Sequence, residues 1–356
     1  MFASVHFKNF QCLRNLSLAS LGRVNLIAGR NNTGKTAILE GLYLLQRPNH
    51  PWLVLKINDF RGFGHFGEAE RFLWTSLFYQ NDPSQEIELY SLDQEQRLSK
   101  LIIRLMERKE DYVPGDLRDS RGETEVGVLT PKYRGDNLEF EYIGTGGESY
   151  ISRALISIDG VRFKSSKLPE KSDFIYIPAR NLPRPTKDAE IYSKLEMQGK
   201  HEFILKALRT VEPRLDRLSV ITSAGISIIH GDIGMGRMIP LTMMGDGLGR
   251  MLNLLLTISN AEGEAVLVNE IENGLHPVIL QPFWDEVAAA LTAFDVQLFS
   301  TTHSWECFKA AYRAMGAGSH DALRLYLLET IDDSIQARSY HGDIFKSNPP
   351  KDAFNG

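Results

Sequence analysis

The segment of the chain whose residue types are most specific for chemistry is Gly29-Arg30-Asn31-Asn32-Thr33-Gly34-Lys35-Thr36, which has the spacing G-x-x-x-x-G-K-[ST]. In this pattern the glycines let backbone N–H groups face an anion, the lysine reaches the β- and γ-phosphates, and the hydroxyl ligates Mg²⁺. The alternative is a chance Lys-Thr pair after a glycine turn, which would require neither a strand before it nor a helix after it. Here an apolar run, Val24 to Ala28, precedes the loop, and leucines at helical spacing follow it from Lys35 to Gln46.

The loop therefore predicts a phosphate-binding site for ATP with Mg²⁺. We expect Lys35 to act in catalysis as well as in binding, and Thr36 to be a metal ligand. The predicted nucleotide contacts of this loop are Gly29, Arg30, Asn31, Asn32, Thr33, Gly34, Lys35, Thr36 and Ala37.

A second candidate segment is Ala265-Val266-Leu267-Val268-Asn269-Glu270, in which an apolar strand ends in polar side chains. Open α/β sheets hold their ligands at the carboxyl ends of strands. We expect Glu270 to polarise the attacking water, and Asn269 to contact Mg²⁺ through a water molecule. The alternative is a strand that ends in solvated acids, which the nearby phosphate loop makes less attractive.

Two further segments are weaker signals. The apolar strand from Val296 to Ser300 is followed by His303, which could sense the γ-phosphate. Most lone histidines have no such role, but the position of this one after the strand favours it. The turn Gly245-Asp246-Gly247 opens an apolar helix and predicts a second anion-binding turn. Its alternative is an ordinary helix start capped by Asp246.

These segments need an α/β framework to bring them together. The last third of the chain alternates apolar strands with helical patterns, which predicts helices at 248–259, 277–293 and 305–315 and strands at 264–269, 296–300 and 323–328. The middle, from Pro51 to Pro178, predicts antiparallel strands, among them a hairpin at Asp159-Gly160, with one helix near Gln94 to Arg108. The stretch from Lys187 to Leu218 predicts a helical lobe interrupted near Pro213.

Composition limits the class of protein. The 356 residues are 43% hydrophobic and 24% charged, with a formal net charge of -5, which favours a globular protein and disfavours one that coats DNA over its whole surface. Two cysteines, Cys12 and Cys307, give no metal-ligand spacing and no disulfide framework. No apolar run approaches the roughly 20 residues of a membrane span, and the N-terminus lacks a signal-peptide core, so we expect a cytoplasmic protein without membrane contact.

The order of the motifs resembles the ABC-type ATPase heads of the RecF, SMC and OLD group, most of all short OLD-like AAA family ATPases. The resemblance rests on the Gly-rich loop, Met244-Gly245-Asp246-Gly247, Asn269-Glu270, the run from Glu272 to Pro277 and Thr302-His303-Ser304. It extends to Phe7-Lys8-Asn9-Phe10 and to the run from Glu40 to Leu45, so it covers both ends of the chain and the middle only weakly.

The resemblance implies a P-loop fold with a mixed central sheet, an antiparallel β subdomain and a helical lobe. Residues 1–50 and 171–356 would form the ATPase core, and 51–170 a β-rich elaboration without a long coiled coil. It makes Gly29 to Thr36 the Walker A loop, Gly245 to Gly247 the signature turn, Asn269-Glu270 the Walker B end and His303 the switch histidine. In such heads the signature turn of one subunit completes the nucleotide site of its twin.

Two departures from the group's pattern bear on activity. Asn269 stands where the group usually has Asp, which predicts weaker metal binding or slow hydrolysis, although Glu270 is retained. Only some fifty residues follow His303, too few for the Toprim nuclease of full OLD proteins, so we expect no intrinsic nuclease activity.

The leading hypothesis is an ATP-hydrolysing switch that dimerises head to head on ATP and controls a separate effector protein, in bacterial anti-phage defence or DNA maintenance. One alternative is a RecF-like clamp that binds nucleic acid, which salt-sensitive binding would reveal. Another is an adaptor that binds ATP with little turnover. Arg180 and the loop 62–67 are minor candidates for nucleic-acid contact, and a solvated arginine and a self-packed loop are the simpler interpretations.

Overall fold

The computed structural model describes residues 1–62, 74–107, 117–118, 124–125, 136–157, 160–168, 175–179, 184–315, 322–342 and 354. Most of the loop 62–67, the side chain of Arg180 and the hairpin turn at Asp159 lie outside these residues.

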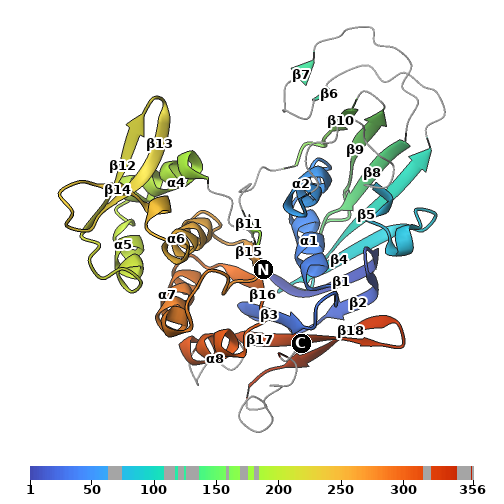
Figure 1. Ribbon diagram of the computed structural model, residues 1–356. Coiled ribbons are helices and arrows are strands. Elements are labelled where there is room, and N and C mark those ends of the chain that lie inside the picture. Colours follow the sequence, from blue (N-terminus) through green and yellow to red (C-terminus); the bar gives the residue numbers. More distant parts are fainter. Residues whose placement is uncertain are drawn as a thin grey trace.

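A six-stranded sheet of order β11-β15-β16-β3-β17-β18 lies at the centre of the molecule (Figure 1). Its first five strands are parallel, and β18 pairs antiparallel to β17. Strands β3, β15 and β16 are buried at every position, as expected for a sheet covered on both faces. Their bounds are β11 (Tyr176–Ile177), β15 (Ala265–Val268), β16 (Gln297–Thr301), β3 (Val24–Gly29), β17 (Leu323–Ile331) and β18 (Ser334–Tyr340).

Parallel strands deliver their carboxyl ends to one edge of a sheet. The Gly-rich loop follows β3, Asn269 follows β15 and Thr302 follows β16. Strand β16 lies between the other two, so the candidate segments leave the sheet side by side.

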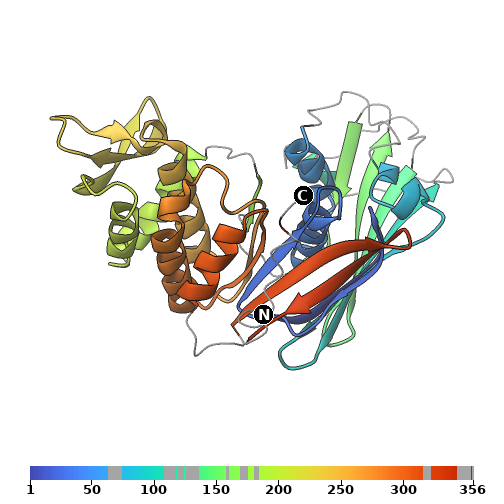
Figure 2. The same cartoon turned by 60° about the horizontal axis from the view of Figure 1, so that its bottom comes forward.

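A second, nine-stranded sheet of order β2-β1-β4-β5-β8-β9-β10-β6-β7 is antiparallel throughout. It meets the central sheet where β2 lies against β18, and Figure 2 shows the red β17–β18 hairpin running beside the blue N-terminal strands. Its strands are β2 (Leu13–Leu18), β1 (Phe2–Phe10), β4 (Ile87–Asp93), β5 (Leu98–Glu107), β8 (Asp136–Ile143), β9 (Ser149–Ser157), β10 (Gly160–Lys164), β6 (Leu117–Arg118) and β7 (Thr124–Glu125).

Helix α1 (Lys35–Gln46) lies between the two sheets. It contacts β3, β15 and β16 of the central sheet and β1 and β4 of the nine-stranded sheet. Gly41 permits this close approach, because a Cβ there would lie 2.6 Å from Phe7 Cε1, inside van der Waals contact. The helix that begins at the phosphate loop is therefore packed against both sheets.

The helical side of the molecule carries α4 to α8 and a small sheet, β12-β13-β14 (Figure 1). The bounds are α4 (Pro185–Met197), α5 (Glu202–Arg209), β12 (Arg217–Ser223), β13 (Ile226–Asp232), β14 (Ile239–Pro240), α6 (Asp246–Ser259), α7 (Leu280–Ala293) and α8 (Trp305–Ala314). Helix α2 (Leu53–Phe60) lies on the other side, next to α1, and short 3-10 turns occupy Tyr79–Asn81, Leu241–Met243 and Pro277–Ile279.

One predicted element was wrong. The helix expected near Gln94 to Arg108 is strand β5, because Leu101 and Ile103 are buried on one face while Lys100 and Arg104 form ion pairs on the other. The helical stretch predicted from Lys187 to Leu218, with an interruption near Pro213, is confirmed as α4 and α5; only its last two residues belong to β12, which begins at Arg217.

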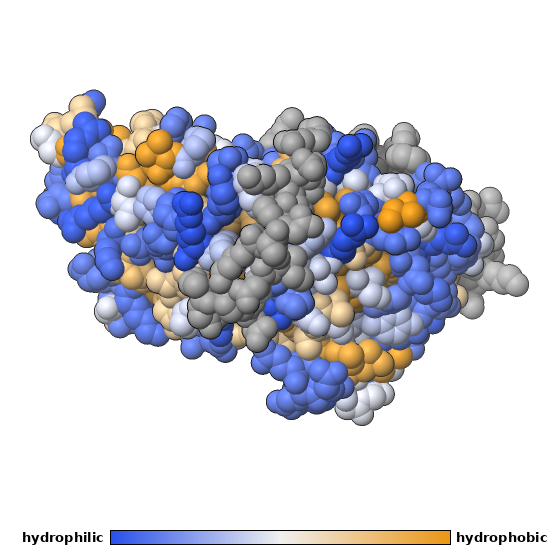
Figure 3. All heavy atoms as spheres, turned by 90° about the horizontal axis from the view of Figure 1, so that it is seen from below, coloured by the Kyte–Doolittle hydropathy of each residue, from blue (hydrophilic) through white to orange (hydrophobic). Residues whose placement is uncertain are grey.

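The predicted mixed α/β architecture was correct. The surface also has the hydrophilic character that the charged fraction of the sequence, 24%, indicates. The face in Figure 3 is mostly hydrophilic, with apolar side chains in separate small areas. Among the described helices, none combines the length and the hydropathy that crossing a membrane requires.

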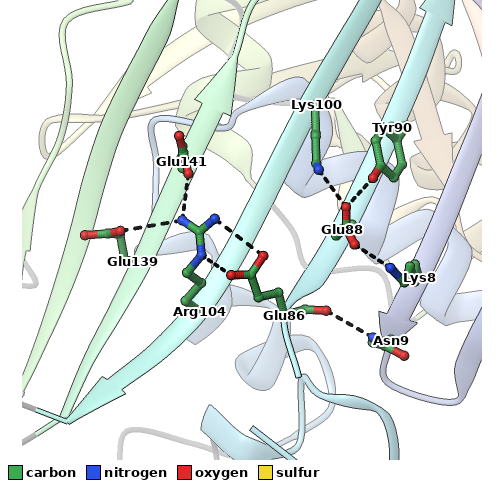
Figure 4. Close-up of polar contacts among 9 residues, drawn as sticks. All are labelled: Lys8, Asn9, Glu86, Glu88, Tyr90, Lys100, Arg104, Glu139 and Glu141. Atoms are coloured by element: carbon green, nitrogen blue, oxygen red, sulfur yellow. Dashed lines mark hydrogen bonds and ion pairs between the residues drawn. The ribbon is translucent and has the colours of Figure 1, made fainter. Parts of the chain in front are cut away.

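The outward face of the nine-stranded sheet carries rows of charges that pair across neighbouring strands (Figure 4). Glu88 accepts hydrogen bonds from Lys8 and Lys100, at 2.6 Å each, and from Tyr90. On the next strands Arg104 contacts Glu86 at 2.5 Å and Glu141 at 2.6 Å. The charges on this face thus largely satisfy one another.

We predict that Glu88→Gln lowers the free energy of unfolding at pH 7 by no more than about 1 kcal/mol, because water screens the pairs. Desolvation alone would raise the pKa of Glu88, but hydrogen bonds from Lys100, Lys8 and Tyr90 outweigh it and lower the pKa to about 2. The stabilisation is complete above the unfolded pKa of about 4.5 and is lost as the pH falls toward about 2. Denaturant melts between pH 7 and pH 2.5 should show the two proteins converging, and a constant difference would contradict the assignment.

Candidate nucleotide site

The Gly-rich loop has the backbone geometry that an anion cradle requires. Gly29 and Gly34 have φ angles of 145° and 83°, and Asn32 one of 62°. A side chain at Gly29 would meet the carbonyl oxygen of Leu328 at 2.6 Å, and one at Gly34 the Leu13 side chain at 2.9 Å and the Cys12 thiol at 3.0 Å. Only glycine fits both positions.

Helix α1 starts at Lys35 with no side-chain cap and no acidic residue in its first turn. The uncapped N–H groups and the positive end of the helix dipole therefore face the loop. Asn31 and Asn32 are exposed and Thr36 is half-buried, whereas Thr33 and Ala37 are buried. The Thr33 hydroxyl donates to the Arg30 carbonyl at 2.8 Å, which closes the loop internally.

The ammonium of Lys35 lies inside the loop. Its Nζ donates to the carbonyl oxygens of Gly29 at 2.8 Å and Arg30 at 2.7 Å, and the residue is only 7% exposed. Burial lowers the pKa of Lys35, and the negative charge of Glu270 partly opposes that effect. Lys35 and Glu270, which are 235 positions apart in the sequence, thus belong to one electrostatic site.

The polar residues after β15 and β16 are joined by one hydroxyl. Thr301 Oγ1 donates to Asn269 Oδ1 at 2.6 Å and accepts from the Glu270 backbone N–H at 2.7 Å. Glu270 has a left-handed φ of 53°, a strained conformation for a non-glycine residue. The threonine helps to hold that conformation.

A buried arginine holds the same turn from the other side. Arg250, on α6 and 3% exposed, donates to the carbonyl oxygens of Asn269 at 2.8 Å, Glu270 at 2.5 Å, Ile271 at 3.3 Å and Ala179 at 3.4 Å. Burial lowers the pKa of Arg250, and the charges of Glu272 and Glu270 act against it. A guanidinium can serve so many acceptors because its donors form a planar fork.

The turn Gly245-Asp246-Gly247 begins α6 and packs on the same segment. Gly245, with φ 114° and ψ 152°, is the cap residue, and the Asp246 side chain makes no cap hydrogen bond, so the alternative of an ordinary cap by Asp246 was wrong. A Cβ at Gly247 would lie 3.1 Å from the Gly274 carbonyl oxygen. Helix α6 therefore approaches the turn after β15 through its glycine as well as through Arg250.

His303 is exposed directly after β16, and its backbone N–H donates to Glu272 Oε1 at 2.7 Å. The structure thus places Lys35, Glu270 and His303 at one edge of the central sheet, and Gly245 to Gly247 against the turn that carries Glu270. The roles of these residues in binding and catalysis stay predictions.

Sequence reasoning missed the supporting residues Thr301, Arg250 and Glu272 as structural partners of the site. One signal was available for Arg250, which is the sole charged residue between Leu248 and Ser259, within an otherwise apolar helical pattern.

The donor set suits a Mg²⁺ ion that arrives with a nucleotide. Among the described residues no group of three or more His, Cys, Asp or Glu side chains could hold a metal. Thr36 offers one hydroxyl, and Asn269 Oδ1 already accepts from Thr301. Mg²⁺ commonly takes most of its ligands from phosphates and water, so these residues fit that ion as minor ligands.

Comparison with known proteins agrees with this geometry. Residues 24–306 match the model of the family described as "AAA domain, putative AbiEii toxin, Type IV TA system". The chain belongs to this family.

Relatives extend the similarity. An "ATP/GTP phosphatase" of Helicobacter pylori is 24% identical over 366 aligned positions, covering 96% of each chain. A Methanocaldococcus jannaschii protein, MJECL10, is 34% identical over 100 residues, or 27% of this chain and 43% of that protein. Among solved structures, an SMC head bound to the C-winged helix domain of ScpA aligns with a TM-score of 0.50 at 11% identity, covering 96% of this chain and 98% of that one. This match confirms the predicted fold of the P-loop ABC type with an antiparallel sheet subdomain.

We predict that Arg250→Lys destabilises the protein by about 2 kcal/mol, because an ammonium cannot reach all four carbonyls and leaves buried acceptors unpaired. Thermal and denaturant unfolding measure the change. The exposed Arg237→Lys is the matched control and should be neutral. An equally stable Arg250→Lys protein would show that the contacts contribute little.

Proposed function

We propose that this protein binds and hydrolyses ATP with Mg²⁺ and uses the bound nucleotide as a switch. The observation that supports this most is the placement of Lys35 and Glu270 in one electrostatic site at the edge where a P-loop, a strand-end acid and His303 meet. Family membership and the similarity to a protein named ATP/GTP phosphatase support the same proposal.

In the proposed mechanism the phosphates replace the Gly29 and Arg30 carbonyls as partners of Lys35, and the loop N–H groups surround them. Thr36, with Asn269 acting through a water molecule, would hold a Mg²⁺ ion, which would supply positive charge to neutralise the phosphates. Glu270 orients and polarises the attacking water, while His303 faces the γ-phosphate. Arg250 and Thr301 keep the Glu270 backbone in its strained conformation.

We expect Glu270→Gln to bind ATP normally and to lower phosphate release at least about a hundredfold, because general-base contributions have that size. Lys35→Ala should instead lose nucleotide binding. Calorimetric titration with ATP and a phosphate-release assay separate the two effects. Wild-type protein that neither binds nor hydrolyses ATP or GTP would refute the proposal.

Asn269 brings no negative charge to the metal, which favours slow turnover. We predict that Asn269→Asp raises the rate of phosphate release and lowers the Mg²⁺ concentration needed for half-maximal activity. The Thr301 hydroxyl can donate to a carboxylate as it does to the amide, so the turn should be preserved. The check is a Mg²⁺ titration of both proteins; equal curves would mean that the Asn is no handicap.

We further propose that ATP brings two copies together through the signature turn. Gly245 is exposed at the start of α6, and the side chains of Met243 and Val278 near it are 76% and 77% exposed, which is unusual for large apolar groups. A twin subunit docked on this surface would cover them and place the positive helix end over the nucleotide.

Met243→Asp should abolish ATP-dependent dimers in light scattering on the Glu270→Gln background, which retains ATP, because the interface would bury an unpaired charge. Met197→Asp is the matched control, since Met197 is 81% exposed on α4. A mass that does not change with Mg-ATP in either protein would contradict the dimer.

The family description, which names a putative AbiEii toxin, supports the proposal of a role in defence. In this proposal the closed dimer controls an effector on another chain. A cytoplasmic location belongs to this proposal. Nucleic-acid binding stays a prediction from the sequence.

A further inference from the structure

Glu272 lies in the turn after β15 and reaches across to the segment after β16. Its Oε1 accepts the backbone N–H of His303 at 2.7 Å, a bond between residues 31 positions apart. Because the acceptor is a carboxylate, this bond is stronger than one between neutral groups. It fixes the backbone of the residue that the proposed function assigns to the γ-phosphate.

The carboxylate is held in a restricted environment. Its second oxygen, Oε2, is buried, and the Cys307 thiol lies beside the carboxylate. The Cys307 thiol is near enough to sense the charge: burial first, and then Glu272, raise the pKa of Cys307 to about 12. Trp284 Nε1 on α7 donates to Cys307 Sγ on α8 at 3.3 Å, which holds the thiol in place.

Glu272 is also connected to the signature helix. Arg250 donates to the carbonyl of Ile271, the preceding residue, and the charge of Glu272 is the largest effect opposing the lowered pKa of Arg250. A half-buried carboxylate is costly unless a nearby cation offsets its charge. Glu272 thus accepts a hydrogen bond from the His303 backbone and interacts electrostatically with Arg250 on α6.

We propose that Glu272 is the positioning residue that orients His303 toward the γ-phosphate and links that orientation to the signature helix. The inference rests on the proposed function. Glu270, by contrast, has its backbone fixed by Thr301 and Arg250, so the two residues of the turn would have separate tasks. Loss of Glu272 should impair recognition of the third phosphate and leave the phosphate loop intact.

The first test needs no nucleotide. Hydrogen exchange of the His303 amide, followed by NMR or mass spectrometry, should be about tenfold faster in Glu272→Ala than in wild type and intermediate in Glu272→Gln, which keeps an acceptor. Glu262→Gln, an exposed acid before β15, is the matched control and should match wild type. Unchanged exchange in Glu272→Ala would overturn the proposal regardless of what the protein hydrolyses.

The second test measures the preference for ATP over ADP. The preference is the dissociation constant for ADP divided by that for a non-hydrolysable ATP analogue. This ratio should fall about tenfold in Glu272→Ala, because the analogue binds more weakly while the affinity for ADP stays constant. His303→Ala should lower the ratio similarly, and the double variant no further. Additive losses, or an equal loss for both nucleotides, would overturn the role. Wild-type protein that binds neither nucleotide would refute the proposed function instead, and the exchange result would stand separately.

If Glu272→Ala proves too unstable to purify, Glu272→Gln carries both tests. Its neutral amide retains the shape and the acceptor, so a smaller change in exchange and in nucleotide preference is expected. No change in either quantity would count against the proposal.

Discussion

The backbone turn after β15 exposes several carbonyl oxygens to the protein interior, and the guanidinium of Arg250 is the group that satisfies them. Its donors reach four carbonyls, of which three belong to the consecutive residues Asn269, Glu270 and Ile271. Buried carbonyls without donors are costly, so the turn depends on this cation. Because Arg250 lies on α6, the position of this helix and the backbone conformation of Glu270 depend on each other.

The central sheet and α1 could be predicted from sequence because burial imposes a simple pattern. Strand β3 is a continuous apolar run, and α1 repeats its leucines at helical spacing. The sequence also indicated tight turns at Gly34 and Gly245, because glycine is the residue that most readily adopts the positive φ angles found there. The names Walker A and Walker B for these segments came from the resemblance to ABC-type ATPase heads and stay predictions.

What the sequence could not reveal is the set of long-range contacts that support the site. Nothing local in the sequence says that Thr301 bonds the Glu270 backbone or that Glu272 accepts from His303. Strand β5 was mistaken for a helix because Leu98, Leu101, Ile102 and Leu105 also fit a helical period, and only the partners on β4 and β8 decide between the two. Pairing across a sheet is a property of the fold and has no signature within one segment.

Lys35 Nζ donates to the carbonyl oxygens of Gly29 and Arg30 inside the loop. Held by these two hydrogen bonds, the Lys35 side chain fills the interior of the loop, so the loop backbone does not collapse into that space. For the proposed function, binding of a phosphate would exchange these two carbonyl partners of Lys35 for phosphate oxygens, with little chain ordering to oppose it. Such a preformed loop should bind phosphate quickly, and the selectivity of the site among ligands would then depend on the residues that surround the loop.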